Sequence, residues 1–158
     1  MPPVVTSDPA YTTTSTRPDE TAQPPDCGAR NIGGTPVRRF CGSGAISVTV
    51  DGVNATSDHA ECTLGTEALS VNGGLLVYGD RTDLGNDVYI GLQVGRAPGS
   101  ANPPAVRDGT YSGLLSAKFN ARSVSVAAAE VTLTSDRHRG TLRGKTANGE
   151  SVTGEFRC

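Results

Sequence analysis

The stretch TLRGKTANGESVTGEF, residues 141–156, decides the fold class. It contains two runs in which apolar and polar residues alternate, with Leu142 in the first run and Val152 and Phe156 in the second. Asn148-Gly149 separates the runs, and this dipeptide tolerates the positive φ angles of a tight turn. Alternation with a period of two is typical of strands that are buried on one face. The stretch therefore predicts an antiparallel β-hairpin.

The same alternation extends through most of the chain, and it predicts an all-β fold. It is clear in the segments 46–50, 88–94, 124–126 and 131–133, and turn dipeptides stand between such segments at Asp51-Gly52, Asn72-Gly73 and Asp108-Gly109. Residues 112–123 contain several helix formers, yet they also fit a strand that leads to Val124. We expect about seven or eight short antiparallel strands, arranged as a small β-sandwich or an open half-barrel.

Composition divides the 158 residues into a tail and one domain. Residues 1–26 hold six of the ten prolines and six threonines, with few large apolar side chains. Such a segment buries too little apolar surface to offset the entropy of ordering, so it is predicted to be a disordered Pro/Thr-rich tether. The glycine-rich residues 27–158 form the predicted folded domain.

Charge and hydropathy exclude two classes of function. The net charge of -2 lacks the basic surplus of a nucleic-acid-binding protein. No stretch approaches the about 18 consecutive apolar residues of a membrane-spanning helix. The chain also begins without the basic and apolar regions of a signal peptide, so we expect that an export segment has been removed ahead of Met1.

The four cysteines, Cys27, Cys41, Cys62 and Cys158, indicate the compartment. Their spacing lacks the close pairs of a zinc site or a redox C-x-x-C motif, so disulfides are the favoured interpretation. Three connectivities are open, and we favour Cys27 with Cys41, which closes a small loop, and Cys62 with Cys158, which ties the two ends of the domain together. Disulfides persist in oxidising compartments, so an extracytoplasmic location is predicted.

Neither histidine makes a convincing catalytic site. His59 lies between Asp58 and Glu61, and adjacent residues of a strand point to opposite faces, whereas a catalytic triad is assembled from separate elements. His138 fits a polar turn. Asp80, Asp83, Asn86 and Asp87 resemble a calcium loop but lack its spacing and its distal Glu. We predict no catalytic, cofactor-binding or metal-binding residues.

Two segments resemble the mycobacterial nineteen-kilodalton lipoprotein antigen family and its actinobacterial relatives. They are ISVTVDGVNATSDHAECT, which ends just after Cys62, and RGTLRGKTANGESVTGEFRC, which ends at Cys158. The resemblance implies a cell-envelope lipoprotein with a lipidated N-terminal cysteine, which this chain lacks, a flexible tether and a small β domain closed by two cysteines. Cys27 and Cys41 depart from that pattern. No catalytic residues are implied.

These observations favour a non-enzymatic ectodomain that is anchored to the membrane only by lipid and exposed on the cell surface as a monomeric binding or antigen module. Its partner would be an envelope or host protein. Two alternatives stay open: an inhibitor or accessory partner of an envelope enzyme, using loops on a rigid scaffold, and a small lipid carrier, which needs an internal cavity.

Overall fold

The computed structural model describes residues 27–78, 87–95 and 104–158, and within them it forms ten β-strands. In chain order these are β1 (Gly28–Ile32), β2 (Thr35–Arg39), β3 (Gly44–Val50), β4 (Val53–Leu64), β5 (Ala68–Val77), β6 (Tyr89–Gly95), β7 (Gly109–Phe119), β8 (Arg122–Thr134), β9 (Arg139–Lys145) and β10 (Ser151–Arg157). None of the described segments forms a helix with the length and apolarity needed to cross a membrane. The predicted tether, residues 1–26, lies outside the described residues.

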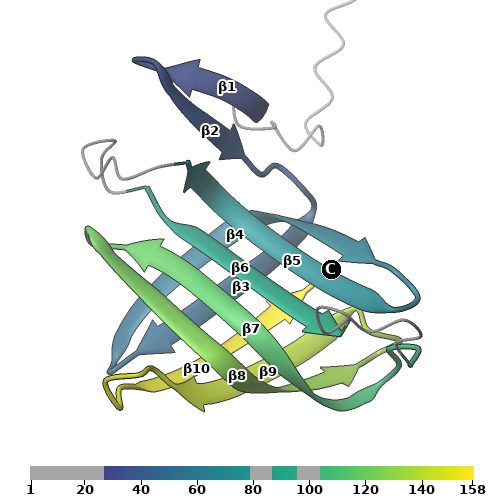
Figure 1. The fold of residues 1–158 in the computed structure, drawn as a ribbon. Coiled ribbons are helices and arrows are strands. Elements are labelled where there is room, and N and C mark those ends of the chain that lie inside the picture. Colours follow the sequence, from purple (N-terminus) through teal and green to yellow (C-terminus); the bar gives the residue numbers. More distant parts are fainter. Residues whose placement is uncertain (1–26, 79–86, 96–103) are drawn as a thin grey trace, which may run out of the picture.

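Eight strands, β3 to β10, close into an antiparallel barrel (Figure 1). Most neighbours are consecutive in the chain, but β3 pairs with β10, so the first and last strands of the barrel are adjacent. The ring is completed by β5 and β6, which pair from Ala68 opposite Gly95 to Gly74 opposite Tyr89. No edge strand is left within the ring, because every barrel strand has two hydrogen-bonded neighbours.

The all-β prediction is confirmed, but the predicted β-sandwich or open half-barrel is wrong. A sandwich strand and a barrel strand both bury alternate residues, so the period of two cannot distinguish a pair of sheets from one closed sheet. Closure depends on long-range pairing of β3 with β10, in which Ala45 lies opposite Arg157. It is helped by bulges in the β3–β4 and β7–β8 pairs, which bend the strands.

One local prediction is wrong, and one open alternative is decided by the structure. Asn72-Gly73 is not a turn but lies inside β5, where Ser57 Cβ and Ile46 Cγ2 would stand 2.7 and 3.0 Å from a Cβ built on Gly73. Gly73 is therefore required by packing rather than by a turn. Residues 112–123 form the end of β7, a two-residue turn and the start of β8, so the strand alternative holds and the helix does not.

The 141–156 hairpin is present as predicted. β9 and β10 pair from Lys145 opposite Ser151 to Arg139 opposite Arg157. The turn is held by the amide of Gly149, which donates to the carbonyl oxygen of Thr146 at 2.9 Å, and Gly149 has φ +85°. A positive φ at this position suits glycine, which has no Cβ to clash.

Apolar side chains fill the barrel. Twenty-two buried residues form one cluster, and no charged or polar residue among the described ones is buried with them. Where an interior position holds glycine, a neighbour occupies its space: a Cβ built on Gly140 would overlap the ring of Phe156. One built on Gly144 would lie 2.8 Å from Val126, and one on Gly113 2.9 Å from Val131. At these three positions the interior has no room for an additional methyl group.

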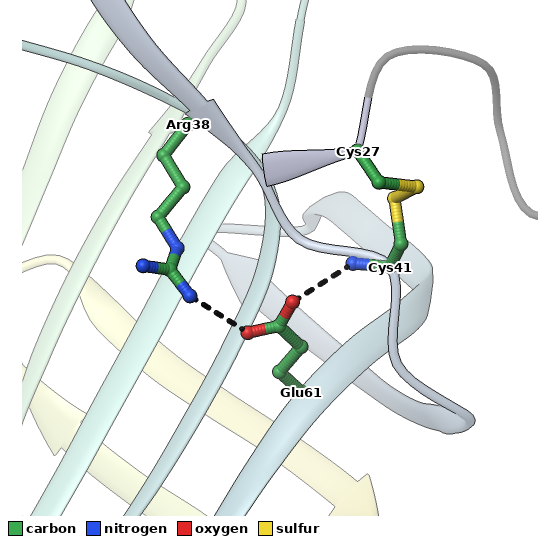
Figure 2. The surroundings of a disulfide bond; sticks show 4 residues. All are labelled: Cys27, Arg38, Cys41 and Glu61. Atoms are coloured by element: carbon green, nitrogen blue, oxygen red, sulfur yellow. Dashed lines mark hydrogen bonds and ion pairs between the residues drawn. A yellow bond between two sulfur atoms is a disulfide. The ribbon is translucent and has the colours of Figure 1, made fainter. Parts of the chain in front are cut away.

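β1 and β2 form a hairpin that stands on the barrel rather than within it (Figure 1). β2 continues the sheet by pairing Val37 to Arg39 with the end of β5, and Val37 and Phe40 are buried. Glu61 of β4 fixes the hairpin to the barrel wall: its carboxylate accepts from the Arg38 guanidinium at 3.2 Å and from the Cys41 amide at 3.4 Å (Figure 2).

Candidate functional site

The structure pairs the cysteines as in the favoured connectivity. Cys27 and Cys41 join the two ends of the β1–β2 hairpin, with their Cα atoms 5.8 Å apart (Figure 2). Cys62 of β4 is bonded to Cys158, which follows β10, with 5.9 Å between Cα atoms. Two disulfides are consistent with an extracytoplasmic location.

The Cys62–Cys158 disulfide crosses the start of β3, which lies between β4 and β10. Gly44 occupies the crossing point: a Cβ at this position would lie 2.7 Å from the Arg157 carbonyl oxygen and 3.1 Å from Cys62 Sγ. Cys62 and Cys158 also pack against the hydrophobic core. Glycine at position 44 therefore leaves the room that the disulfide needs at this end of the barrel.

The two histidines lie in different settings. His59 is half-buried in β4 beside the bulge, and within the described part of the chain it has no hydrogen-bond or ion-pair partner. His138 lies in the β8–β9 turn, where its Nδ1 is 2.9 Å from the carbonyl oxygen of Asp136. That contact makes Nδ1 the protonated nitrogen, since a carbonyl oxygen can only accept. Each ring is thus placed by its own strand or turn, and neither is bonded to a carboxylate of the described residues.

The turn that carries His138 is built from three consecutive residues, Ser135 to Arg137, with φ between +55° and +66°. Left-handed conformations are costly for residues with a Cβ, so this turn must be supported from outside. Asp108 provides part of the support, because its carboxylate accepts the amides of Asp136 at 3.0 Å and Arg137 at 2.7 Å. The Arg137 guanidinium also donates to the carbonyl oxygen of Gly65 at 2.6 Å.

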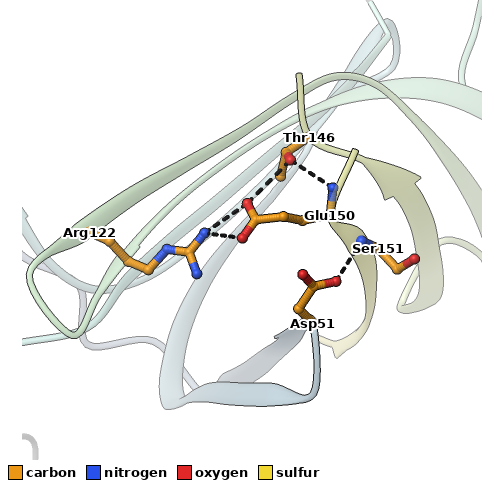
Figure 3. Close-up of polar contacts among 5 residues, drawn as sticks. All are labelled: Asp51, Arg122, Thr146, Glu150 and Ser151. Atoms are coloured by element: carbon orange, nitrogen blue, oxygen red, sulfur yellow. Dashed lines mark hydrogen bonds and ion pairs between the residues drawn. The ribbon is translucent and has the colours of Figure 1, made fainter. Parts of the chain in front are cut away.

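At the opposite end of the barrel, Glu150 joins two hairpins (Figure 3). Its carboxylate accepts from the Arg122 guanidinium at 2.6 and 2.7 Å, and from the Thr146 hydroxyl at 3.3 Å. The Arg122 hydrogen bond holds the pKa of Glu150 below its ordinary value. Nearby, Asp51 accepts the Ser151 amide at 3.0 Å, which ties the β3–β4 turn to β10. These contacts join the turns at this end of the barrel.

Of the calcium-like residues, only Asp87 lies in the described part of the chain. Asp80, Asp83 and Asn86 lie outside it. Asp87 is exposed and forms an ion pair with Arg39 at 3.7 Å, which is a contact between β2 and the start of the β6 segment. Among the described residues no group of three or more His, Cys, Asp or Glu side chains is placed to hold a metal ion.

The outer wall of the barrel carries a depression of about 470 Å³ that the sequence does not single out. It extends across β4, β3, β10, β9 and β8, and we call it the wall groove. Its size lies within the range of small-molecule sites, which is about 300–1,000 Å³. Its polar lining consists of five hydroxyl residues, two carboxylates and two arginines: Ser47, Thr56, Thr132, Thr134, Thr141, Asp58, Glu155, Arg139 and Arg157.

The sheet register explains why these side chains meet. One row across the wall places five residues side by side on adjacent strands, in the order Thr56, Ser47, Glu155, Thr141 and Thr132. The next row places Arg157 of β10 directly opposite Arg139 of β9. Directly opposed residues in an antiparallel pair have Cβ atoms about 5 Å apart. The groove therefore has a row of four hydroxyls and one carboxylate beside a pair of guanidinium groups.

The two groove arginines differ from the other arginines of the wall. Arg143, on the same strand as Arg139, binds Glu130 at 2.6 Å, and Arg122 binds Glu150 at the same distance. Arg139 and Arg157 are exposed and have no ion pair or side-chain hydrogen bond with any described residue. Like charges directly opposite each other destabilise a β-sheet. Binding of a negatively charged ligand would explain why two arginines stand opposite each other here.

A smaller depression, of about 140 Å³, lies on another part of the barrel, over β5, β6 and β7. Tyr89 covers Gly91 there and donates its hydroxyl to Asn72 Oδ1 at 3.1 Å. Burial, and to a lesser extent Tyr78, raises the pKa of Tyr89. Its ring packs at 6.1 Å from Phe40, so Tyr89 links the hairpin to the barrel and serves packing first.

No family model matches the chain, and no curated protein matches it. Among solved structures it is similar to a redesigned β-barrel, mFAP1, bound to DFHBI, with a TM-score of 0.44 and 13% identity over 75% of this chain and 94% of that one. It is also similar to a second redesigned β-barrel, with a TM-score of 0.40 and 16% identity over 75% of this chain and 90% of that one.

Proposed function

We propose that this chain is a non-enzymatic binding module of the cell envelope, displayed outside the cytoplasm on its N-terminal tether and anchored there by lipid. The anchor and the envelope rest on the resemblance to the mycobacterial nineteen-kilodalton lipoprotein antigen family. The two disulfides support an oxidising compartment. Binding would take place on the outside of the barrel, where the wall groove lies.

The observation that carries the binding proposal is the contrast between a filled interior and a hollowed wall. The interior glycines Gly113, Gly140 and Gly144 are closely contacted by core side chains, so even a methyl group does not fit at these positions. This packing speaks against the lipid carrier, which needs room for an acyl chain inside the barrel. The wall groove instead offers polar side chains on the outer surface, although the hydroxyls of Thr56 and Thr132 are already bonded to Asn54 and Thr110.

The location and the anchor can be tested by expressing the natural gene with its own upstream sequence in an actinobacterial host fed with an alkyne-tagged fatty acid. We expect the label on the protein, recovery with the envelope fraction, and loss of label when the cysteine that precedes the tether is changed to alanine. Unlabelled protein in the cytoplasmic fraction would contradict the proposal.

The carrier alternative can be tested on the full chain with N-phenyl-1-naphthylamine, a dye that becomes fluorescent in apolar cavities. We expect no fluorescence increase above that of a sample without protein, and native mass spectrometry should give the mass of the protein without a bound lipid. Stoichiometric dye binding, or a lipid retained in the native spectrum, would instead support a carrier.

A further inference from the structure

We infer that the wall groove binds an acidic saccharide, that is, a sugar ring that carries a carboxylate. The inference rests on the proposed function as a binding module, because it names the ligand of the module. It is argued from the three kinds of group that line the groove: paired arginines, hydroxyls with carboxylates, and an apolar floor.

The arginines account for the carboxylate. Arg139 and Arg157 lie directly opposite each other, with no carboxylate partner among the described residues. Guanidinium groups bind carboxylates through two parallel hydrogen bonds, and a carboxylate between two guanidinium groups would also relieve their mutual repulsion. Ala45, the neighbour of Arg157 on β3, has a side chain too short to fill the space beside the pair.

The remaining polar groups account for the hydroxyls of a sugar. The hydroxyls of Ser47 and Thr141 can donate or accept, whereas that of Thr132 already shares a hydrogen bond with the Thr110 hydroxyl at 3.2 Å. The carboxylates of Asp58 and Glu155 only accept when ionised. Such acceptors suit a ligand with many hydroxyl donors. They oppose a ligand whose charge is spread over its whole surface, such as a polyphosphate, because that ligand would face two negative groups.

The apolar floor of the wall groove suits the ring of a sugar. Ala45, Ile46, Gly140 and Phe156 contribute apolar or backbone surface beneath the polar groups. The C–H face of a sugar can lie on such a surface while its hydroxyls reach the sides. The groove volume of about 470 Å³ accommodates a monosaccharide with part of a second ring.

The test is a titration of the full-length, ¹⁵N-labelled chain with D-glucuronate, followed by amide chemical shifts. We expect saturable shifts centred on Ser47, Thr141 and Glu155, weakening as salt is raised. D-Glucose lacks the carboxylate, and acetate and inorganic phosphate lack the ring, so each should bind on the order of ten-fold more weakly than D-glucuronate.

Substitutions of the arginines test whether D-glucuronate binds in the wall groove. The double variant R139Q/R157Q should weaken D-glucuronate binding on the order of ten-fold or more, because both guanidinium groups are lost. R143Q is the control: it removes one positive charge from the same strand and face as Arg139, but the Arg143 guanidinium already binds Glu130, so the affinity should stay within about two-fold. Matching amide spectra of the free variants would exclude a folding defect.

Four results would overturn the inference: no shifts with D-glucuronate, equal binding of acetate or phosphate, equal binding of D-glucose, or equal weakening in R143Q and R139Q/R157Q. None of these bears on the fatty-acid label or on the apolar dye. Failure of the saccharide inference is therefore distinguishable from failure of the proposed function.

Discussion

Removal of the Cys62–Cys158 disulfide should destabilise the domain more than removal of Cys27–Cys41. The former bridges a sequence separation of 96 residues and the latter one of 14. In the chain-entropy model these loops correspond to about 4.7 and about 3 kcal/mol of restriction in the unfolded chain. Native disulfides of small domains contribute about 2–5 kcal/mol when measured, so we expect a loss in that range for C62A/C158A.

The structure widens the difference between the two disulfides. Cys62 and Cys158 pack against the main core, so their replacement also removes buried contacts. The Cys27–Cys41 bond joins strands that already pair over five residues, from Gly28 opposite Arg39 to Ile32 opposite Thr35. That hairpin stands outside the barrel, so it can open locally while the barrel stays folded.

The assay is urea unfolding of the full chain without reductant, monitored by far-ultraviolet circular dichroism. C62A/C158A and C27A/C41A are each compared with the wild type, and paired substitutions avoid leaving a free thiol that could exchange. Each free energy is extrapolated to zero urea, because the slope also changes when a cross-link is removed from the unfolded chain. An equal or greater loss in C27A/C41A would refute the reasoning, since it would make the hairpin part of the cooperative barrel.

Three further predictions concern individual residues. Gly140→Ala should lower the free energy of unfolding in urea by about 1–3 kcal/mol, because the new methyl group meets the Phe156 ring. The loss should shrink when Gly140→Ala is combined with Phe156→Leu, and losses that simply add in the double variant contradict the clash. Ala121→Gly should raise the free energy of unfolding by about 0.5–1 kcal/mol, because residue 121 has φ +58°, and an unchanged urea midpoint argues against strain there. The lowered pKa of Glu150 stabilises the fold above the ordinary glutamate pKa, and this contribution is lost as pH falls through the lowered value. The difference in urea midpoint between wild type and Glu150→Gln should therefore be present at neutral pH and vanish in acid. A difference that is constant with pH contradicts the role of Arg122.

Local pattern was enough to predict strands and hairpins, because alternation and turn chemistry are properties of neighbouring residues. The 141–156 hairpin illustrates this: its alternation and its Asn148-Gly149 turn are both read from the sequence. Asn72-Gly73 illustrates the limit. The same dipeptide that forms a turn at Asn148-Gly149 lies inside β5 here. Glycine is needed at position 73 because Ser57 and Ile46 occupy the space of a Cβ. Only the assembled barrel distinguishes the two cases.

The wall groove could not be predicted from the sequence for a related reason. Arg139 and Arg157 are separated by 18 positions, and Thr56 and Thr132 come from opposite halves of the chain. Each occupies the polar phase of its own strand, which predicts only exposure to solvent. Their convergence depends on the registers of β3 with β10 and of β10 with β9, and no local signal fixes the first of these.

The pairing of β3 with β10 has a consequence for how the chain is made. A ribosome or a translocation channel releases the polypeptide from its N-terminus, so β3 emerges long before the strand that completes its hydrogen bonding. The barrel cannot close until Arg157 is free to lie opposite Ala45, and Cys62 must wait as long for Cys158. Closure of the barrel is thereby postponed until β10 has been released. The same connectivity keeps the barrel open while the chain passes through a channel, and formation of the Cys62–Cys158 bond then reports that β10 has emerged.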